Sequence, residues 1–333
     1  MLIALGTIIP SVCVVALLSG PLFPFKPAPS SIALRVENAS DLDLYLKDAE
    51  AQHAGVRPDL AKTVLWNDPK THGRTPLALV YLHGFSASRR DISPVAETLA
   101  GMLGANAFLT RLAAHGLASP AEFATVTPQD WLDDAREALA IGKRIGDRVV
   151  LMGISTGALL ATMAALEDNS PRLAALILLS PNFAIADRRA KFVSGPFGPW
   201  LARTFIGKDY SFAPDSSGHA AFWTSRYPSH GIVALMDLVN YAQTLRLSEL
   251  TVPTLIIYTD KDTVVDTSAI EARFDEIQSA HKLIIDLPEA TRHELTGDAL
   301  APQTVRPVLA RIVGFLSTIG IRVKLRSPQI ENR

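Results

Sequence analysis

Six short runs of apolar residues, separated by stretches with helical periodicity, constrain the fold of this 333-residue chain more than any other feature. Parallel strands that are covered by helices on both faces read as nearly continuous apolar runs. One of the stretches between them carries a helix start, because Thr127 can cap a helix that begins at Pro128, and Asp130 completes a capping box. The pattern predicts an α/β fold, with a doubly wound, mostly parallel sheet and helices on both of its faces. The predicted strands are residues 77–82, 107–110, 148–152, 175–179, 253–258 and 282–287.

The alternation of strands and helices is interrupted between residues 183 and 250. A structureless loop of that length is unusual inside a compact domain, so we expect an inserted helical lid at 183–250. The interval holds 11 of the chain's 23 aromatic residues, which either line an apolar substrate pocket or form the lid's own core. The expected core therefore consists of residues 31–182 and 251–320, followed by a tail at 321–333.

Residues 1–25 contain no charged side chain, and Lys26 is the first. About 20 apolar residues suffice for a helix to cross a bilayer, so this segment predicts a membrane anchor. Two alternatives stay open. One is a cleaved signal peptide, for which Ala28 and Ser30 supply small residues but a basic n-region is missing, and the other is a helix packed on the protein's own surface. Prolines make the end of residues 1–30 a stiff linker. We expect the protein to be membrane-associated, or exported if the segment is cleaved, with the side of the membrane open.

The composition excludes several classes of function. Charged residues make up 20% of the chain and the formal net charge is −1, so no nucleic-acid partner is expected. Cys13 is the single cysteine, which rules out an intrachain disulfide. The histidines show no metal-ligand spacing, and we expect neither a metal nor a cofactor. The oligomeric state stays open.

The residues Gly-Ile-Ser-Thr-Gly at positions 153–157 lie between the predicted strand 148–152 and a helical run of small residues at 158–166. In this context the pattern G-x-S-x-G predicts a nucleophile elbow, a sharp turn from strand to helix that exposes one serine. The following helix would direct its N-terminal N–H groups toward the place where an oxyanion forms. Ser155 is therefore the candidate nucleophile.

A serine hydroxyl needs a base to become nucleophilic near neutral pH. His293 is the best candidate, because it follows the last predicted strand, 282–287, by a short loop. Such loops place side chains at the carboxyl edge of the sheet, where open α/β folds bind their ligands.

Three aspartates compete for the position beside that base. Asp260, Asp262 and Asp266 all follow the predicted strand 253–258 within a few residues. Asp266 fits the cap of the next helix and Asp260 fits a turn, so Asp262 is favoured as the partner of the histidine. The chain order of serine, aspartate and histidine is the one expected when this triad is built on such a fold.

The oxyanion hole requires backbone donors near the serine. The N–H of Thr156, directly after the nucleophile, is one candidate, and the N–H of Phe85, in the loop after strand 77–82, is the other. Gly84 permits a tight reversal of that loop. We interpret His83 as a structural residue that bonds the loop backbone rather than as a proton carrier.

These motifs resemble the serine hydrolases of the α/β-hydrolase superfamily, and most of all their esterase, monoacylglycerol-lipase and serine-aminopeptidase-like branch. The residues that carry the resemblance are 83–85, 153–157, 262–265 and 292–294. The resemblance implies Ser155 as nucleophile, His293 as general base and Asp262 as its partner. It also implies that Phe85 and Thr156 supply the oxyanion donors.

The function favoured by these residues is hydrolysis of carboxylic esters, with apolar or lipid-like acyl groups, through an acyl-enzyme. The same triad also serves amide or peptide, thioester and C–C bond hydrolysis, which the sequence leaves open as alternatives. A membrane-tethered binding protein without catalytic activity is the alternative from another class.

Overall fold

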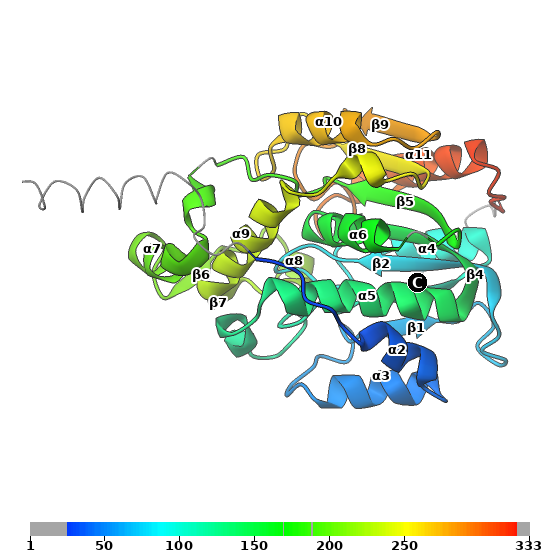
Figure 1. Ribbon diagram of the computed structural model, residues 1–333, viewed down its shortest axis with the longest axis horizontal. Helices are drawn as coiled ribbons and strands as arrows, with labels where there is room; N and C mark the ends of the chain where they lie inside the picture. The colour runs from blue at the N-terminus through cyan, green and yellow to red at the C-terminus, as the bar shows by residue number, and fades with distance from the viewer. Residues whose placement is uncertain (1–24, 169, 188, 325–333) are drawn as a thin grey trace, which may run out of the picture.

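The computed structural model describes residues 25–324, apart from residues 169 and 188. Within these residues, seven strands form one sheet in the order β1-β3-β2-β4-β5-β8-β9 (Figure 1). The pairs in this sheet are parallel, except that β1 runs antiparallel to β3. The prediction of a mostly parallel sheet is confirmed, and the six predicted strands are present with ends shifted by one or two residues. The strands are β1 Thr63–Leu65, β2 Thr75–Leu82, β3 Asn106–Leu109, β4 Gly146–Ile154, β5 Leu173–Leu179, β8 Thr254–Tyr258 and β9 Lys282–Asp286.

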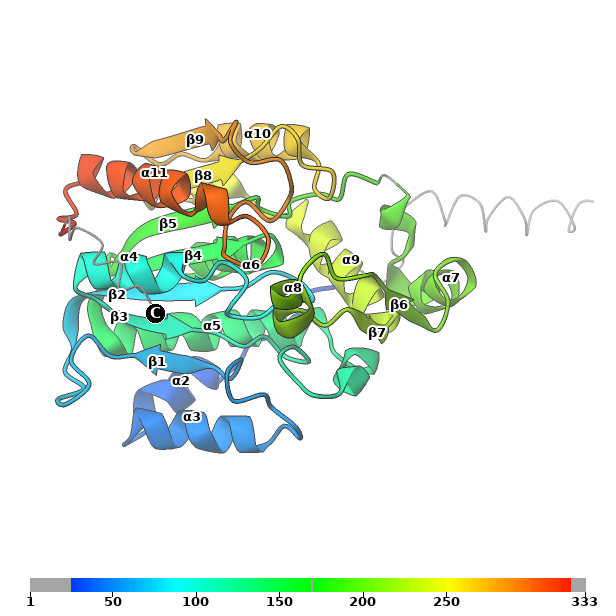
Figure 2. The same ribbon diagram turned by 180° about the vertical axis from the view of Figure 1, so that it is seen from behind.

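Helices cover both faces of the sheet, as the two views in Figures 1 and 2 show. One face carries α5 Pro128–Ile145, α6 Thr156–Glu167 and α10 Thr267–Glu276, and the other carries α4 Val95–Leu103 and α11 Val305–Thr318. Successive strand residues point to opposite faces, so Val80 belongs to the core beneath α5 and α6. Its neighbours Leu79 and Tyr81 belong to the core beneath α4 and α11. The doubly wound arrangement is therefore confirmed.

Helix α5 begins where the sequence predicts. The Asp130 N–H donates to the Thr127 hydroxyl, and the Asp130 carboxylate accepts from the Thr127 N–H at 2.8 Å. The buried Trp131 in its first turn donates its indole N–H to the Ala113 carbonyl at 3.0 Å. Local capping chemistry and one aromatic anchor thus fix both the start and the orientation of this helix.

Two short helices, α2 Ile32–Asn38 and α3 Leu42–Ala51, precede the sheet and lie beside α5 (Figure 1). Lys62, which follows them, places its Nζ 2.7 Å from Glu137 of α5, and both side chains are buried. A buried ion pair whose partners also bond other groups holds a segment in one place. This ion pair connects the segment that follows α3 to helix α5.

The segment 183–250, called the insertion below, lies at the carboxyl ends of the strands (Figure 2). It contains several short helices and a two-stranded antiparallel pair, β6 with β7. Its aromatic residues divide into groups: Phe183 and Tyr227 are buried, whereas Trp200 and Phe205 are exposed. Its elements are η2 Ala190–Phe192, η3 Gly195–Phe197, α7 Gly198–Phe205, β6 Asp209–Ser211, α8 Ser217–Phe222, β7 Arg226–Pro228, α9 His230–Ala242 and η4 Leu247–Glu249.

The predicted anchor or signal segment, residues 1–25, lies outside the described part of the chain except for Phe25. Among the helices that the structure does describe, none is both long and apolar enough to cross a membrane.

Candidate active site

The turn from β4 into α6 holds Ser155 in a conformation that non-glycine residues rarely adopt. Its φ is 53° and its ψ is −119°, and α6 begins at the next residue, Thr156. A Cβ on Gly157 would lie 2.2 Å from the Leu82 carbonyl oxygen, and one on Gly153 would lie 2.4 Å from the Gly157 carbonyl oxygen. The turn therefore requires glycine at both positions, and the strain at the serine is typical of functional sites.

The structure brings three of the predicted residues into one hydrogen-bonded chain. His293 Nε2 lies 2.8 Å from Ser155 Oγ, and His293 Nδ1 lies 2.6 Å from Asp262 Oδ2. The other carboxylate oxygen of Asp262 accepts the N–H groups of Val264 and Val265 at 2.8 and 3.0 Å. With both of its oxygens engaged, this carboxylate holds the imidazole in one orientation. Nδ1 donates to the carboxylate, so Nε2 is free to accept the serine proton.

The two competing aspartates lie elsewhere. Asp266 caps α10 by accepting the N–H groups of Ser268 and Ala269, as predicted. Asp260 is exposed, and its N–H donates to a carboxylate oxygen of Asp286 at 3.0 Å. Of the three, the structure places Asp262 against the histidine.

The protonation states suit proton transfer between the serine and the histidine. Burial disfavours a charged His293, but the hydrogen bond and negative charge of Asp262 outweigh it and raise the pKa of the imidazole. Burial likewise works against a charged Asp262, yet the donors around it, His293 first, lower the pKa of its carboxyl. Asp262 therefore stays ionised at neutral pH, and His293 is a stronger base than a free imidazole.

Two backbone N–H groups close to the serine in the fold have no internal partner. Among the described residues, neither the Phe85 nor the Thr156 amide donates a hydrogen bond to another group of the protein. The loop that carries Phe85 lies against the elbow, because a Cβ on Gly84 would be 3.5 Å from the Ser155 Cβ. The N-terminal end of α6 adds the partial positive charge of the helix dipole close to Ser155. This arrangement fits the stabilisation of an oxyanion.

Two buried histidines hold the Phe85 loop in shape. His83 donates from Nδ1 to the Gly84 carbonyl at 2.9 Å and accepts the Leu112 N–H at Nε2. His115 accepts the Ser86 N–H at Nε2, 2.9 Å away. Burial lowers the pKa of His83 to about 4, so it is neutral near pH 7 and plays a structural part here.

The insertion contributes Trp223, the C-cap of α8, to the surroundings of the serine. Trp223 lines the cavity beside Ser155, whose volume is about 40 Å³. Arg292, next to the histidine, pairs with Asp215 of the insertion at 2.7 Å. Ligand pockets usually enclose some 300–1,000 Å³, so this cavity is much smaller than a typical ligand pocket.

Comparison with known proteins places the chain among the hydrolases. Residues 73–299 match the family described as Serine aminopeptidase, S33. The chain belongs to this family. This S33 hydrolase is 26% identical over 213 residues to a thermostable monoacylglycerol lipase of Bacillus sp. (strain H-257), a match that covers 64% of the chain and 81% of the lipase.

Two solved structures share its fold. The structure described under LipS and LipT, two metagenome-derived lipolytic enzymes, has a TM-score of 0.63 at 20% identity and covers 79% of the hydrolase and 99% of its own chain. The monoacylglycerol lipase of Paleococcus ferrophilus has a TM-score of 0.57 at 14% identity. The match covers 78% of the hydrolase and 99% of the lipase chain. Together with the family match, these relatives show a lipase- or esterase-like α/β-hydrolase, and the predicted superfamily is confirmed.

Asp91 is a site residue of the hydrolase that the sequence analysis missed. Its carboxylate is 4% exposed, borders the same cavity, and accepts the N–H groups of Gly84 and Ile92 at 3.0 and 2.8 Å together with the hydroxyl of Tyr81. Burial outweighs these donors and raises the pKa of Asp91 to about 7. Tyr81 is the sequence feature that indicates a buried acceptor here, because a tyrosine inside a buried strand needs a partner for its hydroxyl.

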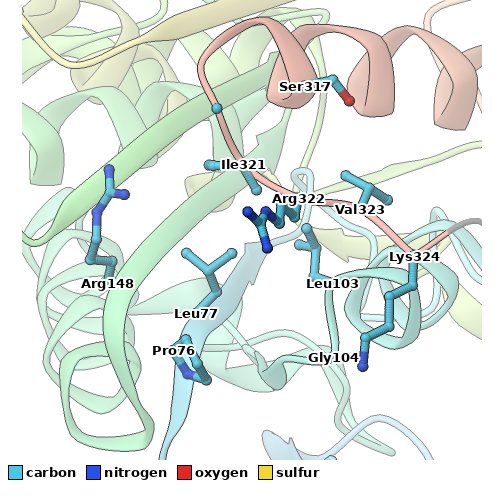
Figure 3. A pocket seen from close by; sticks show the side chains of 11 residues that line it. Pro76, Leu77, Leu103, Gly104, Arg148, Ser317, Ile321, Arg322, Val323 and Lys324 are labelled. Atoms are coloured by element: carbon cyan, nitrogen blue, oxygen red, sulfur yellow. The ribbon is translucent and has the colours of Figure 1, made fainter.

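A second hollow, of about 1040 Å³, lies at the opposite end of the hydrolase near the start of β2 (Figure 3). Arg148, Arg322 and Lys324 line it together with apolar side chains such as Leu77. Ligands of open α/β sheets bind outside the carboxyl ends of the strands, which is the other end of the molecule. The predicted site residues lie away from this hollow, so its size does not make it the active site.

Within the described ranges, no cluster of three or more His, Cys, Asp or Glu side chains is arranged to hold a metal ion.

Proposed function

We propose that this protein hydrolyses carboxylic esters through Ser155, His293 and Asp262. One observation carries the proposal: the unbroken chain of contacts from Ser155 Oγ through both imidazole nitrogens to the Asp262 carboxylate. A serine, a base and an orienting carboxylate within hydrogen-bond reach form the constellation that acyl transfer requires.

In the first half of the reaction, Ser155 Oγ attacks the carbonyl carbon of the ester, and its proton passes to His293 Nε2. The negative charge that develops on the carbonyl oxygen lies between the N–H groups of Phe85 and Thr156. Collapse of this intermediate breaks the bond to the alcohol oxygen, which leaves with the proton from His293. Asp262 stabilises the imidazolium throughout without taking its proton.

In the second half, water replaces the alcohol. His293 removes a proton from the water as the water oxygen attacks the acyl carbon, and the same two N–H groups receive the charge again. The proton then returns to Ser155 Oγ as the carboxylic acid leaves. Apart from the ester and the water, every group in this cycle belongs to the chain itself.

The substrate we propose is an ester with an apolar, lipid-like acyl group. Trp223 and Phe85, two apolar residues, border the cavity. Among the relatives are a monoacylglycerol lipase and lipolytic enzymes, which point in the same direction. We also propose, from the charge-free residues 1–24, that the protein works at a membrane.

Ester kinetics test this function. A series of p-nitrophenyl esters from short to long acyl chains should give turnover that vanishes in Ser155→Ala, and kcat/KM should rise with acyl length. The matching acyl p-nitroanilides distinguish ester from amide hydrolysis and should react far more slowly. Full ester turnover in Ser155→Ala contradicts the proposal, and faster cleavage of the anilides favours the amide alternative.

A further inference from the structure

Three basic side chains line the large hollow at the amino ends of the strands, at the opposite end of the molecule from Ser155. Arg148 belongs to β4, and Arg322 and Lys324 follow α11. In Figure 3 the side chain of Arg322 lies between those of Arg148 and Lys324, so that all three surround one opening. Among the described residues that line the hollow, none is an aspartate or a glutamate. We call Arg148, Arg322 and Lys324 the basic cluster.

The short segment after α11, which supplies two members of the basic cluster, is held in place. Gly320 has a φ of 79°, a left-handed conformation that favours glycine, and it turns the chain away from the helix. The N–H of Ile321 then donates to the carbonyl of Leu316 at 2.9 Å. The N–H of Lys324 donates to the carbonyl of Met102, in α4, at 2.8 Å. Two hydrogen bonds thus fix the segment across the C-terminal ends of α11 and α4.

Burial alternates along this segment. Ile321 and Val323 pack against the core beneath α4 and α11. Arg322 and Lys324, which alternate with them, are exposed. The apolar residues therefore anchor the segment, and the two basic side chains share its solvent-facing side. Together with Leu77, Ile321 and Val323 also give the hollow an apolar wall.

The charge of the basic cluster has little compensation within the protein. None of its three side chains donates a hydrogen bond or forms an ion pair within the part of the chain that the structure describes. Asp147, next to Arg148 in β4, pairs with Arg74 at 2.9 Å instead. Lys324 Nζ would lie 3.8 Å from a Cβ on Gly104, the C-cap of α4, so the helix dipole compensates this lysine in part. For the two arginines, an anion in the hollow would supply the missing negative charge.

The size and the walls of the hollow indicate what kind of anion fits. Its volume of about 1040 Å³ is at the upper end of the range of about 300–1,000 Å³ that is usual for pockets that hold small organic ligands. Arginine binds carboxylate and phosphate oxygens through paired N–H groups. Leu77 and Leu103 offer apolar surface that an aliphatic chain would remove from water. Cations and apolar walls in one hollow match a ligand that has a charged head and an apolar body.

The chain's own tail is a poor match for this hollow. Residues 325–333 contain two arginines and one glutamate. Side chains that are more basic than acidic do not complement a cluster of three cations. The occupant that fits the charge is a separate, anionic molecule.

We propose that this hollow binds an amphipathic anion, an aliphatic carboxylate or phosphate monoester. Its head group is held by Arg148 and Arg322, and its chain lies against the apolar wall that includes Leu77 and Ile321. The site is distinct from Ser155 and its partners, and the proposal does not rest on the function proposed for them.

Isothermal titration calorimetry on the full chain tests the proposal. The probes are octanoate and octyl phosphate, with octanol as the ligand that lacks the charge and inorganic phosphate as the ligand that lacks the chain. At least one of the two amphipathic anions should bind at least tenfold more tightly than either octanol or inorganic phosphate. The tighter of the two identifies the head group that the site takes.

Two double variants locate the binding. Arg148→Gln/Arg322→Gln should weaken it at least tenfold. Arg203→Gln/Arg306→Gln removes two other exposed arginines, which do not line the hollow, and should change the affinity less than twofold. Because the arginines of the basic cluster are exposed and bond no other described residue, both double variants should keep the urea midpoint of the unmodified protein.

Several results would overturn the proposal. Octanol that binds as tightly as the amphipathic anions reduces the hollow to an apolar surface, and inorganic phosphate that does so reduces it to a charged one. Failure of both amphipathic anions to bind, or unchanged affinity in Arg148→Gln/Arg322→Gln, rejects the site. Tighter binding by Glu331→Gln would assign the hollow to the chain's own tail. None of these measurements requires ester turnover, so the site can fail while the proposed function holds, and the reverse.

Discussion

Replacing Asp91 with asparagine tests how the loop that carries Phe85 is held. Burial raises the pKa of this carboxyl from 3.8 to about 7. A carboxyl with a raised folded pKa stabilises the fold fully below its unfolded pKa, and this contribution is lost as the pH rises through the folded pKa. At about 1.36 kcal/mol per pKa unit, ionisation of Asp91 lowers the free energy of unfolding by about 2–3 kcal/mol between pH 5 and pH 8. Asparagine does not ionise and removes this pH dependence.

Urea unfolding at pH 5 and pH 8, followed by tryptophan fluorescence, measures the effect. The stability of Asp91→Asn relative to the unmodified protein should rise by about 2–3 kcal/mol from the lower to the higher pH. Asparagine also cannot accept from both Gly84 and Ile92, so one N–H loses its acceptor. The loop then holds the Phe85 N–H less firmly, and stabilisation of the oxyanion that is weaker by about 1 kcal/mol corresponds to roughly a fivefold lower kcat.

Asp134→Asn is the matched control for this experiment. Burial also raises the pKa of Asp134 to about 7, but its carboxylate accepts the N–H of Ala113 at 2.6 Å rather than that of Gly84. Each variant should have a stability that depends less on pH than that of the unmodified protein, and only Asp91→Asn should show a lower kcat. A stability difference for Asp91→Asn that stays constant with pH, together with an unchanged kcat, refutes the reasoning.

Three further predictions concern the serine and its partners. Asp262→Asn should lower kcat by about four orders of magnitude while Asp260→Asn changes it less than twofold, and a larger loss at position 260 would reverse the assignment. Because Asp262 raises the pKa of His293 against the effect of burial, kcat/KM for a soluble ester should rise with pH through a value above 6.5, and a midpoint below 6.5 speaks against His293 as the base. Gly157→Ala places a Cβ 2.2 Å from the Leu82 carbonyl oxygen, so its urea midpoint should fall markedly, and a normal midpoint would show that the turn is less tight than described.

Local sequence chemistry predicted the features that depend on neighbours in the chain. The strands are recognisable because parallel strands covered on both faces are apolar throughout. The elbow at Ser155 and the cap at Thr127 follow from a few adjacent residues with fixed conformational needs. The position of His293 followed from its short distance to the last strand, which places it at the carboxyl edge of the sheet.

Features that depend on the fold of a loop or on contacts between distant segments could not be predicted. Asp91 lies only seven residues from Gly84 and ten from Tyr81, but its contacts depend on how the loop between them folds, and Tyr81 alone does not say which residue receives its hydroxyl. Likewise, the sequence shows that the insertion is rich in aromatic residues, but not that Trp223 borders the cavity beside the serine while Trp200 is exposed. The direction of each ring is set by the packing of the insertion as a whole.

Covalent labelling at Ser155 tests the central claim most directly. After reaction with a fluorophosphonate, tryptic digestion and mass spectrometry should find the phosphonyl adduct on peptide 149–172, at Ser155. Ser155→Ala should lose the label, and Ser170→Ala, a control on the same peptide, should retain it. An unlabelled native protein, or an adduct that persists in Ser155→Ala, contradicts the assignment of this serine as the nucleophile.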